Sequence, residues 1–329
     1  MTRTAAVRSR LASRSTLFAL ATLATACSRA AVVPLQSPAP SDTRTVQERL
    51  GYPATARLLI LHADDIGMSH SVNRASLEAL EKGWITSASI LVVSPWFAEA
   101  ATWARAHPDA DLGIHLALNS EWTTLRWGPI SGRSEVPTLL AADGYLPLVT
   151  DSVERTNPRE VERELRAQID LARRSGVNIT HLDSHMGALF RAEAPFDVYL
   201  GLGQSYGLPV LLERTSVPGS APPAELGERA QTRALVDRVL QMLPGVSREQ
   251  WVDAYKTMLA PLGPGVYQLI LHLGYDDDEM RGATFDHPAW GAAWRQWDFD
   301  LVRNPEFRDW LKQQGFQLIT WRELAKARR

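Results

Sequence analysis

Short apolar runs alternate with helical patterns along the chain from about residue 55 onward. The first run, residues 58–61, ends at polar residues and is typical of a buried strand. Apolar residues at helical spacing follow over 72–80, and Gly83 ends that pattern. A strand followed by a helix, repeated along a chain, predicts parallel strands joined by helices. Further strands are predicted over 87–93, 112–118, 177–182 and 266–271, with a candidate over 209–212, and a further helix over 96–107.

A long segment without periodicity separates the third strand from the next helix. Residues 119–156 are rich in Gly, Pro, Ser and Thr, which predicts irregular structure. The helix that follows has a clear start, with Asn157 as cap, Pro158 in the first turn and Glu160 as the capping partner. Together the elements predict a single α/β domain over residues 55–329. Such domains are barrels or open sheets, and both place functional residues at the carboxyl ends of their strands.

The first 54 residues are predicted to lie outside this domain. Residues 1–27 combine four arginines with an apolar stretch too short to span a bilayer, which is typical of an export signal. The single cysteine, Cys27, lies where a lipoprotein cleavage box would place it, and this predicts a lipid anchor in the periplasm or cell envelope. A plain secretory signal is the alternative. Residues 28–54 contain four prolines and are predicted to form a tether.

Composition narrows the class of protein. The 329 residues are 45% hydrophobic and 22% charged, with a formal net charge of −2, as in an ordinary globular protein. One cysteine excludes an intramolecular disulfide. The lack of a basic block argues against sequence-independent binding to nucleic acid, so no nucleic-acid partner is expected. The 11 tryptophans, among them the group Trp290, Trp294 and Trp297, fit either core packing or stacking on sugar rings.

Acidic and histidine side chains recur at the ends of the predicted strands. Each has an ordinary structural explanation when taken alone, such as a helix cap or a buried core histidine. Because the carboxyl ends of parallel strands meet at one edge, we expect these side chains to converge. One carboxylate and two imidazoles would leave positions on a divalent ion open for water and substrate, as in a hydrolytic metal site. The set comprises Asp64, Asp65, His115, His181, Asp183, His185 and His272.

The adjacent pair Asp64 and Asp65 is expected to divide two tasks. In an extended chain neighbouring side chains point to opposite faces. One carboxylate could then bind a metal ion directly, while the other faces a substrate water.

Most of these positions belong to five motifs that follow one another in a fixed order. The motifs are Ala63-Asp64-Asp65-Ile66-Gly67, Thr86-Ser87-Ala88-Ser89, Gly113-Ile114-His115-Leu116, His181-Leu182-Asp183-Ser184-His185 and His272-Leu273-Gly274-Tyr275. With them the chain resembles the YdjC-like carbohydrate deacetylases, also named the ChbG/HpnK family. The resemblance runs from Leu58 to about Tyr275, and five motifs in order are far more specific than any one of them.

The resemblance implies a deformed α/β barrel that removes an acetyl group from N-acetylated sugars with the help of one divalent ion, Mg²⁺ or Zn²⁺. Carried over by motif, Asp65, His115 and His185 would bind the ion, Asp64 would be the general base and His272 the general acid. Two other functions remain open. One is a non-catalytic sugar-binding lipoprotein on the same fold, and the other is a metal-dependent esterase or phosphoesterase.

The chain departs from the family pattern at four places in or near these motifs: at His62, at Ile66 and Leu273, where Phe and Pro are common, and after the fourth motif. His62 stands where Asn is common, and it could add to the site or hydrogen-bond beside it. Many members carry further histidines after the fourth motif, where this chain has Met186, Gly187 and Ala188. The predicted metal ligands are intact, so these departures concern the substrate more than the ion.

Overall fold

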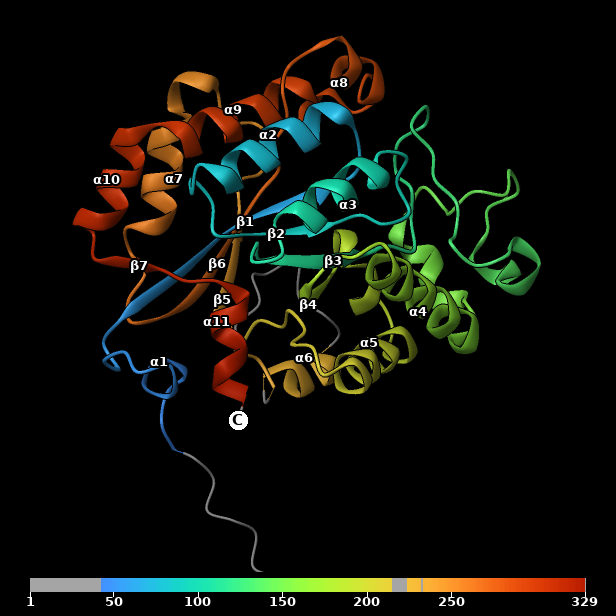
Figure 1. Cartoon of the computed structure of the whole chain (residues 1–329), viewed down its shortest axis with the longest axis horizontal. Helices are drawn as coiled ribbons and strands as arrows, with labels where there is room; N and C mark the ends of the chain where they lie inside the picture. The colour runs from blue at the N-terminus through green and yellow to red at the C-terminus, as the bar shows by residue number, and fades with distance from the viewer. Residues whose placement is uncertain (1–42, 215–223, 232, 329) are drawn as a thin grey trace, which may run out of the picture. The chain divides into compact units, whose positions relative to one another are not determined.

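The computed structural model describes residues 43–214, 224–231 and 233–328 (Figure 1). The chain divides into two units, residues 1–43 and residues 44–329, and all the helices and strands described belong to the second. The predicted export signal with Cys27, and the predicted tether up to residue 42, lie outside the described residues. Among the residues described, no helix is long and apolar enough to cross a membrane.

The folded unit begins earlier than the tether boundary predicted at residue 54. Helix α1 (Val46–Arg49) starts with a capping box, in which Thr45 and Glu48 each accept a hydrogen bond from the backbone of the other. Val46 is buried in a small core cluster, and the hydroxyl of Tyr52 donates to Glu323 at 2.7 Å. Residues 44–54 are therefore part of the domain, because their apolar side chains pack onto it.

Within the described part of the chain, seven parallel strands form the central sheet. Strand β1 is the longest and pairs with three others: with β6 along one edge, and with β7 and then β2 along the other. The order across the sheet is β4-β3-β2-β1-β6-β5, with β7 beside the first residues of β1. The strands are β1 (Arg57–Ile66), β2 (Ser87–Ile90), β3 (Leu112–Leu116), β4 (Ile179–Ser184), β5 (Arg238–Gln241), β6 (Gly265–Leu271) and β7 (Phe316–Leu318).

The two outer strands of this sheet are connected by isolated bridges. Leu182 in β4 pairs with Val210, and Glu213 pairs with Val236 just before β5, both in parallel. Each of these links is a single residue pair without a continuous ladder, so the sheet is not closed into a regular barrel. The predicted parallel α/β fold is confirmed. The candidate strand over 209–212 is reduced to one bridge.

Helices surround the strands, with α2, α3 and α9 above them and α5 and α6 below in the view of Figure 1. Helix α4 starts at Pro158 and is capped by Asn157, as predicted. Glu160 does not complete a capping box, because its carboxylate accepts from the backbone and hydroxyl of Thr138 instead. The helices beyond α1 are α2 (His70–Glu81), α3 (Phe97–Ala106), α4 (Pro158–Arg174), α5 (Glu193–Tyr206), α6 (Ala224–Gln231), α7 (Trp251–Leu259), α8 (Asp278–Ala283), α9 (Ala292–Arg303), α10 (Pro305–Gln313) and α11 (Trp321–Leu324).

The strands at the centre of the sheet are buried on both faces. Every residue of β1 after Arg57 is buried, and β2 and β3 are buried throughout. Continuous apolar runs of this kind are expected where helices cover both faces of a parallel sheet. Polar side chains therefore enter the core only at a few places, and the largest group lies at the carboxyl ends of β1, β3 and β4.

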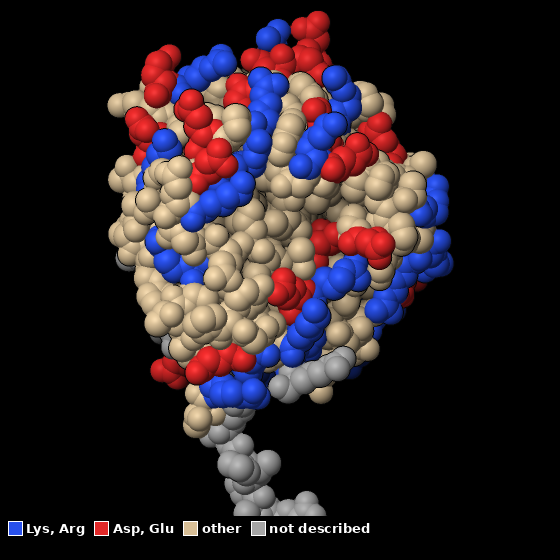
Figure 2. Space-filling view, turned by 60° about the vertical axis from the view of Figure 1, so that its left-hand side comes forward, with Lys and Arg blue, Asp and Glu red and all other residues tan. Residues whose placement is uncertain are grey.

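The surface carries charges of both signs. Figure 2 shows one face on which Lys and Arg side chains lie among Asp and Glu side chains. Across the described surface, oppositely charged side chains also pair at short range, such as Arg303 with Asp300 at 2.9 Å. This mixture agrees with the formal net charge of −2.

Candidate active site

The carboxyl ends of three strands bring one carboxylate and two imidazoles together. Asp65 comes from β1, His115 from β3, and His185 directly follows β4. Oδ1 of Asp65 lies 3.6 Å from Nε2 of His115 and 3.5 Å from Nδ1 of His185. All three residues are buried, and one potential ligand atom from each lies within 4.8 Å of the others. The structure thus places the three predicted metal ligands in one cluster.

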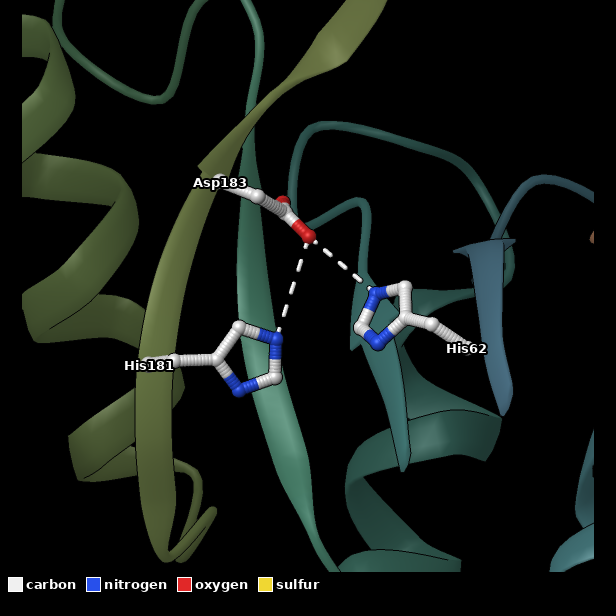
Figure 3. Close-up of side chains that lie close together, drawn as sticks. All are labelled: His62, His181 and Asp183. Carbon is white, nitrogen blue, oxygen red and sulfur yellow. Dashed lines mark ion pairs between the residues drawn. The ribbon is translucent and has the colours of Figure 1, made fainter. Parts of the chain in front are cut away.

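The ring nitrogen of His115 that faces away from Asp65 is hydrogen-bonded to an ionised carboxylate, that of Asp183. Its Nδ1 donates to Oδ1 of Asp183 at 2.7 Å, which leaves Nε2 facing Asp65. Asp183 lies in β4 and also faces His62 and His181 (Figure 3). Burial alone would raise the pKa of Asp183, but His115 and His62 hold it well below its usual range. Asp183 therefore fixes the orientation of the His115 ring, as carboxylates do behind metal-binding histidines.

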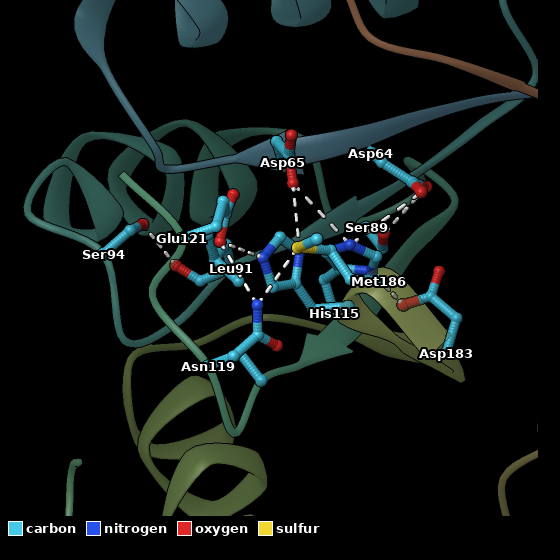
Figure 4. A network of polar contacts seen from close by, with 12 residues as sticks. Asp64, Asp65, Ser89, Leu91, Ser94, His115, Asn119, Glu121, Asp183 and Met186 are labelled. Carbon is cyan, nitrogen blue, oxygen red and sulfur yellow. Dashed lines mark hydrogen bonds and ion pairs between the residues drawn. The ribbon is translucent and has the colours of Figure 1, made fainter. Parts of the chain in front are cut away.

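His185 is held by a residue that the sequence analysis did not single out. Nε2 of His185 donates to Oε2 of Glu121 at 2.9 Å, so that Nδ1 faces Asp65. Glu121 lies in the irregular segment after β3, and the side-chain amide of Asn119 donates to the same oxygen at 3.3 Å (Figure 4). Burial would lower the pKa of His185, but Glu121 and Asp65 raise it to about 10. The two histidines thus present opposite ring nitrogens to one carboxylate, Nε2 of His115 and Nδ1 of His185.

Asp64 and Asp65 lie where the end of β1 is irregular. Pairing with β2 shifts register between Ala63 and Ile66, and Asp65 has a φ of 68°, in the left-handed region that few non-glycine residues adopt. The alternation of side chains expected for an extended strand is broken here. Oδ2 of Asp64 and Oδ1 of Asp65 lie 3.8 and 3.6 Å from the same Nε2 of His115. Both carboxylates therefore reach one site, instead of pointing apart as expected.

A buried arginine completes the surroundings of Asp65. Oδ2 of Asp65 accepts from Nη2 of Arg295 in α9 at 2.9 Å, a contact that the sequence analysis missed. Burial would raise the pKa of Asp65, but Arg295 and the nearby histidines hold it well below its usual range. Oδ1 of Asp65 is buried and has no hydrogen-bond partner among the described residues. An ionised, unpaired oxygen between two ring nitrogens fits a single divalent ion, so Asp65, His115 and His185 suit that role.

Both the sequence and the structure of the chain match known proteins. The sequence profile described as YdjC-like protein matches residues 58–313. The chain belongs to the YdjC-like protein family. A carbohydrate deacetylase from Thermus thermophilus is 33% identical over 85% of this chain and 98% of its own length, and one from Brevibacillus brevis is 36% identical over 81% and 99%. A crystal structure of an Enterococcus faecalis protein, 25% identical, matches 82% of this chain and 99% of that chain with a TM-score of 0.67. The resemblance drawn from the five motifs is confirmed.

In this YdjC-like chain the last motif places His272 just after β6. Its backbone N–H donates to Oδ2 of Asp298 at 2.9 Å. The other oxygen of Asp298 accepts from Tyr255 at 2.6 Å and from Trp251 at 3.1 Å, so α7 and α9 hold this end of β6. Nδ1 of His272 has no partner among the described residues, and burial together with Arg295 lowers the pKa of His272 to about 4. The His272 ring is therefore neutral near pH 7 in the free YdjC-like protein.

The tryptophan group near α9 forms part of the wall behind His272. Trp294 is buried, and its ring lies 5.0 Å from that of His272. Trp290 meets it edge-on at 4.9 Å, and Trp251 packs against both Trp294 and Trp297 at 6.3 and 5.2 Å. Of the two uses considered for this group, packing accounts for the contacts of Trp294.

Two of the four departures from the family pattern, at His62 and at Met186, differ in their burial. His62 is fully buried beside Asp64 and Asp183, and although burial would lower its pKa, these carboxylates raise the pKa of His62 to about 9. Met186 is exposed and has a φ of 50°, and the side-chain amide of Asn119 donates to its sulfur at 3.0 Å (Figure 4). His62 thus belongs to the buried side of the site and Met186 to the open side.

Proposed function

We propose that this chain removes the acetyl group from an N-acetylated sugar or oligosaccharide, with one divalent ion held by Asp65, His115 and His185. The chain is a hydrolase that acts on amide C–N bonds. The carbohydrate deacetylases named above, which align with most of the chain, support this reaction class. The observation that carries the metal site is the buried, unpaired Oδ1 of Asp65 between two ring nitrogens. The two nitrogen donors favour Zn²⁺ over Mg²⁺, which prefers oxygen ligands.

The proposed chemistry is hydrolysis of an acetamide. When bound, a divalent ion would supply Lewis-acid activation of a water and of the acetamide carbonyl. Asp64 is placed beside the same ring nitrogen as Asp65 and would take a proton from the attacking water. The new bond joins the water oxygen to the carbonyl carbon, and the C–N bond then breaks to give acetate and a free amine.

His272 is the proposed proton donor to the leaving nitrogen. Its pKa of about 4 leaves the ring neutral in the free protein, so the proton that it donates must reach it during the reaction, and the proton that Asp64 takes from the water is the available source. Negative charge that develops on the carbonyl oxygen would raise the pKa of His272 and favour that uptake. His272 can therefore donate a proton only with substrate in place.

The test of this function is acetate release from N-acetylated oligosaccharides by the purified protein. We expect acetate release that stops after chelation and returns with added Zn²⁺ or Mg²⁺. Aryl esters and phosphate esters serve as the comparison, because turnover of these alone would assign an esterase or a phosphoesterase. Binding of oligosaccharide without any turnover under all metal conditions would leave the sugar-binding alternative.

We further propose that the protein is exported and anchored by lipid at Cys27. The arginine-rich start, the short apolar stretch and the position of the single cysteine support this. Intact mass of membrane-extracted protein is the measurement, and we expect a chain that begins at a lipid-modified Cys27. A chain cleaved beyond Cys27, or an uncleaved one, would contradict the anchor.

A further inference from the structure

Arg295 is a buried cation with hydrogen-bond donors to spare. Its side chain is 3% exposed, and Nη2 donates to Oδ2 of Asp65 at 2.9 Å. Nε and Nη1 are buried and have no hydrogen-bond partner among the described residues, and Arg295 is the one described arginine with two such nitrogens. Buried N–H groups of a charged side chain are rarely left unpaired, because the loss of their hydration is costly. These groups therefore indicate an acceptor that comes from a bound molecule.

Asp65 itself does not supply that acceptor. Its Oδ1 faces Nε2 of His115 and Nδ1 of His185, so it is turned toward these rings (Figure 4). A carboxylate that binds arginine with both oxygens fills one edge of the planar guanidinium, whereas Asp65 gives Arg295 one oxygen. The guanidinium therefore keeps a position for a second oxygen beside Asp65.

The indole ring of Trp122 covers the guanidinium without replacing the acceptor. Cζ of Arg295 lies 5.9 Å from the centre of the ring, near the limit of about 6 Å for a favourable cation–π contact. Trp122 is buried, and the backbone N–H of the next residue, Thr123, donates to Asp286 at 2.8 Å. Arg295 is thus held between Asp65 and a fixed ring, and donors that are held in place before a reaction stabilise developing charge most effectively.

The last sequence motif gives Arg295 its room and its second neighbour in the site. A Cβ at Gly274 would lie 3.2 Å from Cβ and 3.5 Å from Cδ of Arg295, so a side chain there would crowd the arginine. His272 lies two residues earlier, and the charge of Arg295 adds to burial in lowering the pKa of His272. The guanidinium therefore lies near both the proposed metal ligand Asp65 and the proposed proton donor. An acetyl group that reacts beside these two residues comes within reach of Arg295.

We propose that Arg295 is a further catalytic residue, which donates hydrogen bonds to the carbonyl oxygen of the acetyl group and, after cleavage, to the carboxylate of acetate. This inference rests on the proposed function. When the water oxygen bonds to the carbonyl carbon, the π electron pair of the C=O bond moves onto the carbonyl oxygen, and it returns as the C–N bond breaks. Arg295 transfers no proton in either step. Its fixed charge stabilises the charged oxygen of the transition state more than the neutral amide.

An ion pair that only orients Asp65 is the competing explanation. In that case Arg295→Lys would weaken zinc binding, and saturation with zinc would restore parent behaviour. Direct contact with the acetyl group instead predicts a loss that remains when zinc is saturating. Measurements at saturating zinc therefore separate the two explanations.

The first test is the affinity of the zinc-saturated protein for acetate, measured by calorimetry in the parent and in Arg295→Lys. Lysine keeps the charge, but its single nitrogen is taken by Asp65. We expect acetate to bind at least about 10-fold more weakly, the usual effect of losing a hydrogen bond to a charged group. With an N-acetylated substrate, kcat should fall by about 10²–10³-fold, as for loss of an oxyanion donor, and KM should change less. Parent acetate affinity in Arg295→Lys would overturn the proposal.

The second test needs no substitution. Nitrogen-edited NMR of the zinc-saturated parent follows the guanidinium N–H signals of Arg295, assigned through their correlation to its backbone, while sodium acetate is added. We expect these signals to move to lower field in proportion to bound acetate, because new hydrogen bonds form. Signals that stay unchanged at saturating acetate would overturn the proposal, as would a parent protein that binds no acetate.

The matched control is Arg57→Lys, at the opposite end of β1 from Asp65. The guanidinium of Arg57 donates to the backbone carbonyl of Gln314 at 2.7 Å and lies 4.0 Å from the ring centre of Phe316. We expect this variant to melt at a lower temperature and to bind acetate as the parent does, and an equal loss of acetate affinity would overturn the proposal. If the parent releases no acetate from any substrate, the proposed function fails, and acetate affinity and the N–H signals still decide whether Arg295 binds a carboxylate.

Discussion

At the scale of single residues, the carboxylates of Asp64 and Asp65 point to the same site but contact different side chains. The bulge at the end of β1 brings both carboxylates to Nε2 of His115. Asp65 is paired with the guanidinium of Arg295, whereas Asp64 lies against the ring of His62. The buried oxygen of Asp65 that has no hydrogen-bond partner among the described residues is therefore the one proposed to bind an ion, and Asp64 is the one proposed for proton transfer.

Substitution of the two aspartates should separate these roles. We expect Asp64→Asn to keep the fold and the metal content while kcat falls by about 10²–10⁴-fold, the typical loss for a general base. Asp65→Asn should bind the metal ion more weakly and lose activity for that reason, so excess ion should restore part of its activity. Metal content and steady-state rates of both variants are the measurements. Full rescue of Asp64→Asn by added metal would contradict the base assignment, and an exchange of the two behaviours would reverse the roles.

Glu121 offers a second prediction at this scale. Its hydrogen bond to Nε2 of His185 turns the other ring nitrogen toward Asp65. We expect Glu121→Ala to weaken zinc binding by about 10–100-fold, as for other partners behind metal ligands. In Glu121→Gln a side-chain oxygen can still accept from the His185 ring, so this variant should lose less zinc affinity than Glu121→Ala. Glu135→Ala, an exposed glutamate in the same irregular segment, is the control, and equal affinities in all three variants would argue against this role.

The candidate site was predictable only where its residues lie in strands. Asp65, His115 and His185 stand out because polar residues interrupt or end apolar runs, and parallel strands place such ends together. Glu121 lies in a segment without periodicity, and Arg295 meets Asp65 across 230 positions of sequence. No local pattern marks either residue, because their role depends on tertiary packing alone.

At the scale of elements, Asp298 ties α9 and α7 to the end of β6. Burial raises the pKa of Asp298 to about 7, compared with about 3.9 for Asp in an unfolded chain. The folded protein thus binds this proton more tightly, so the contribution of Asp298 to stability is present below about pH 4 and is lost as the pH rises to about 7.

We therefore expect the melting temperature to decrease as the pH rises from about 5 to about 8. In Asp298→Asn this decrease should be smaller. The amide keeps one acceptor oxygen, for Tyr255 or for the His272 backbone but not for both, and it cannot ionise, so the variant should melt lower at every pH with a smaller pH dependence. Thermal melts across this pH range are the measurement, with Asp300→Asn on the same helix as control. An unchanged slope in Asp298→Asn would show that Asp298 does not titrate in this range.

The elements themselves were predictable to different degrees. The apolar runs that became β1, β3 and β6 and the Asn157-Pro158 start of α4 were predicted, since burial and capping leave a local pattern. Strand β5 was not, because Arg238 is exposed and its run is short and mixed. Strands β1 and β4 extend further than predicted, because polar Asp64, Asp65 and Asp183 lie within them where an apolar pattern would end.

At the scale of the whole molecule, the segment before β1 is expected to support the domain. Val46 is buried, Leu50 packs beside it, and Tyr52 bonds to Glu323 near the other end of the chain. Burial of two such side chains contributes about 2–4 kcal/mol. A protein shortened to begin at residue 55 should therefore melt several degrees lower than one that begins at residue 43. Equal melting temperatures would mean that residues 44–54 add nothing to stability.

The pairing of β1 has a consequence for how the protein is made. Its neighbour β2 comes from the next part of the chain, but β6 and β7 come from residues 265–271 and 316–318. Residues up to 318 must therefore be synthesised before the middle of the sheet can close, and contacts this far apart also form slowly. A nascent chain whose central strand still lacks these partners remains unfolded there, which suits passage through a membrane pore under the predicted export signal.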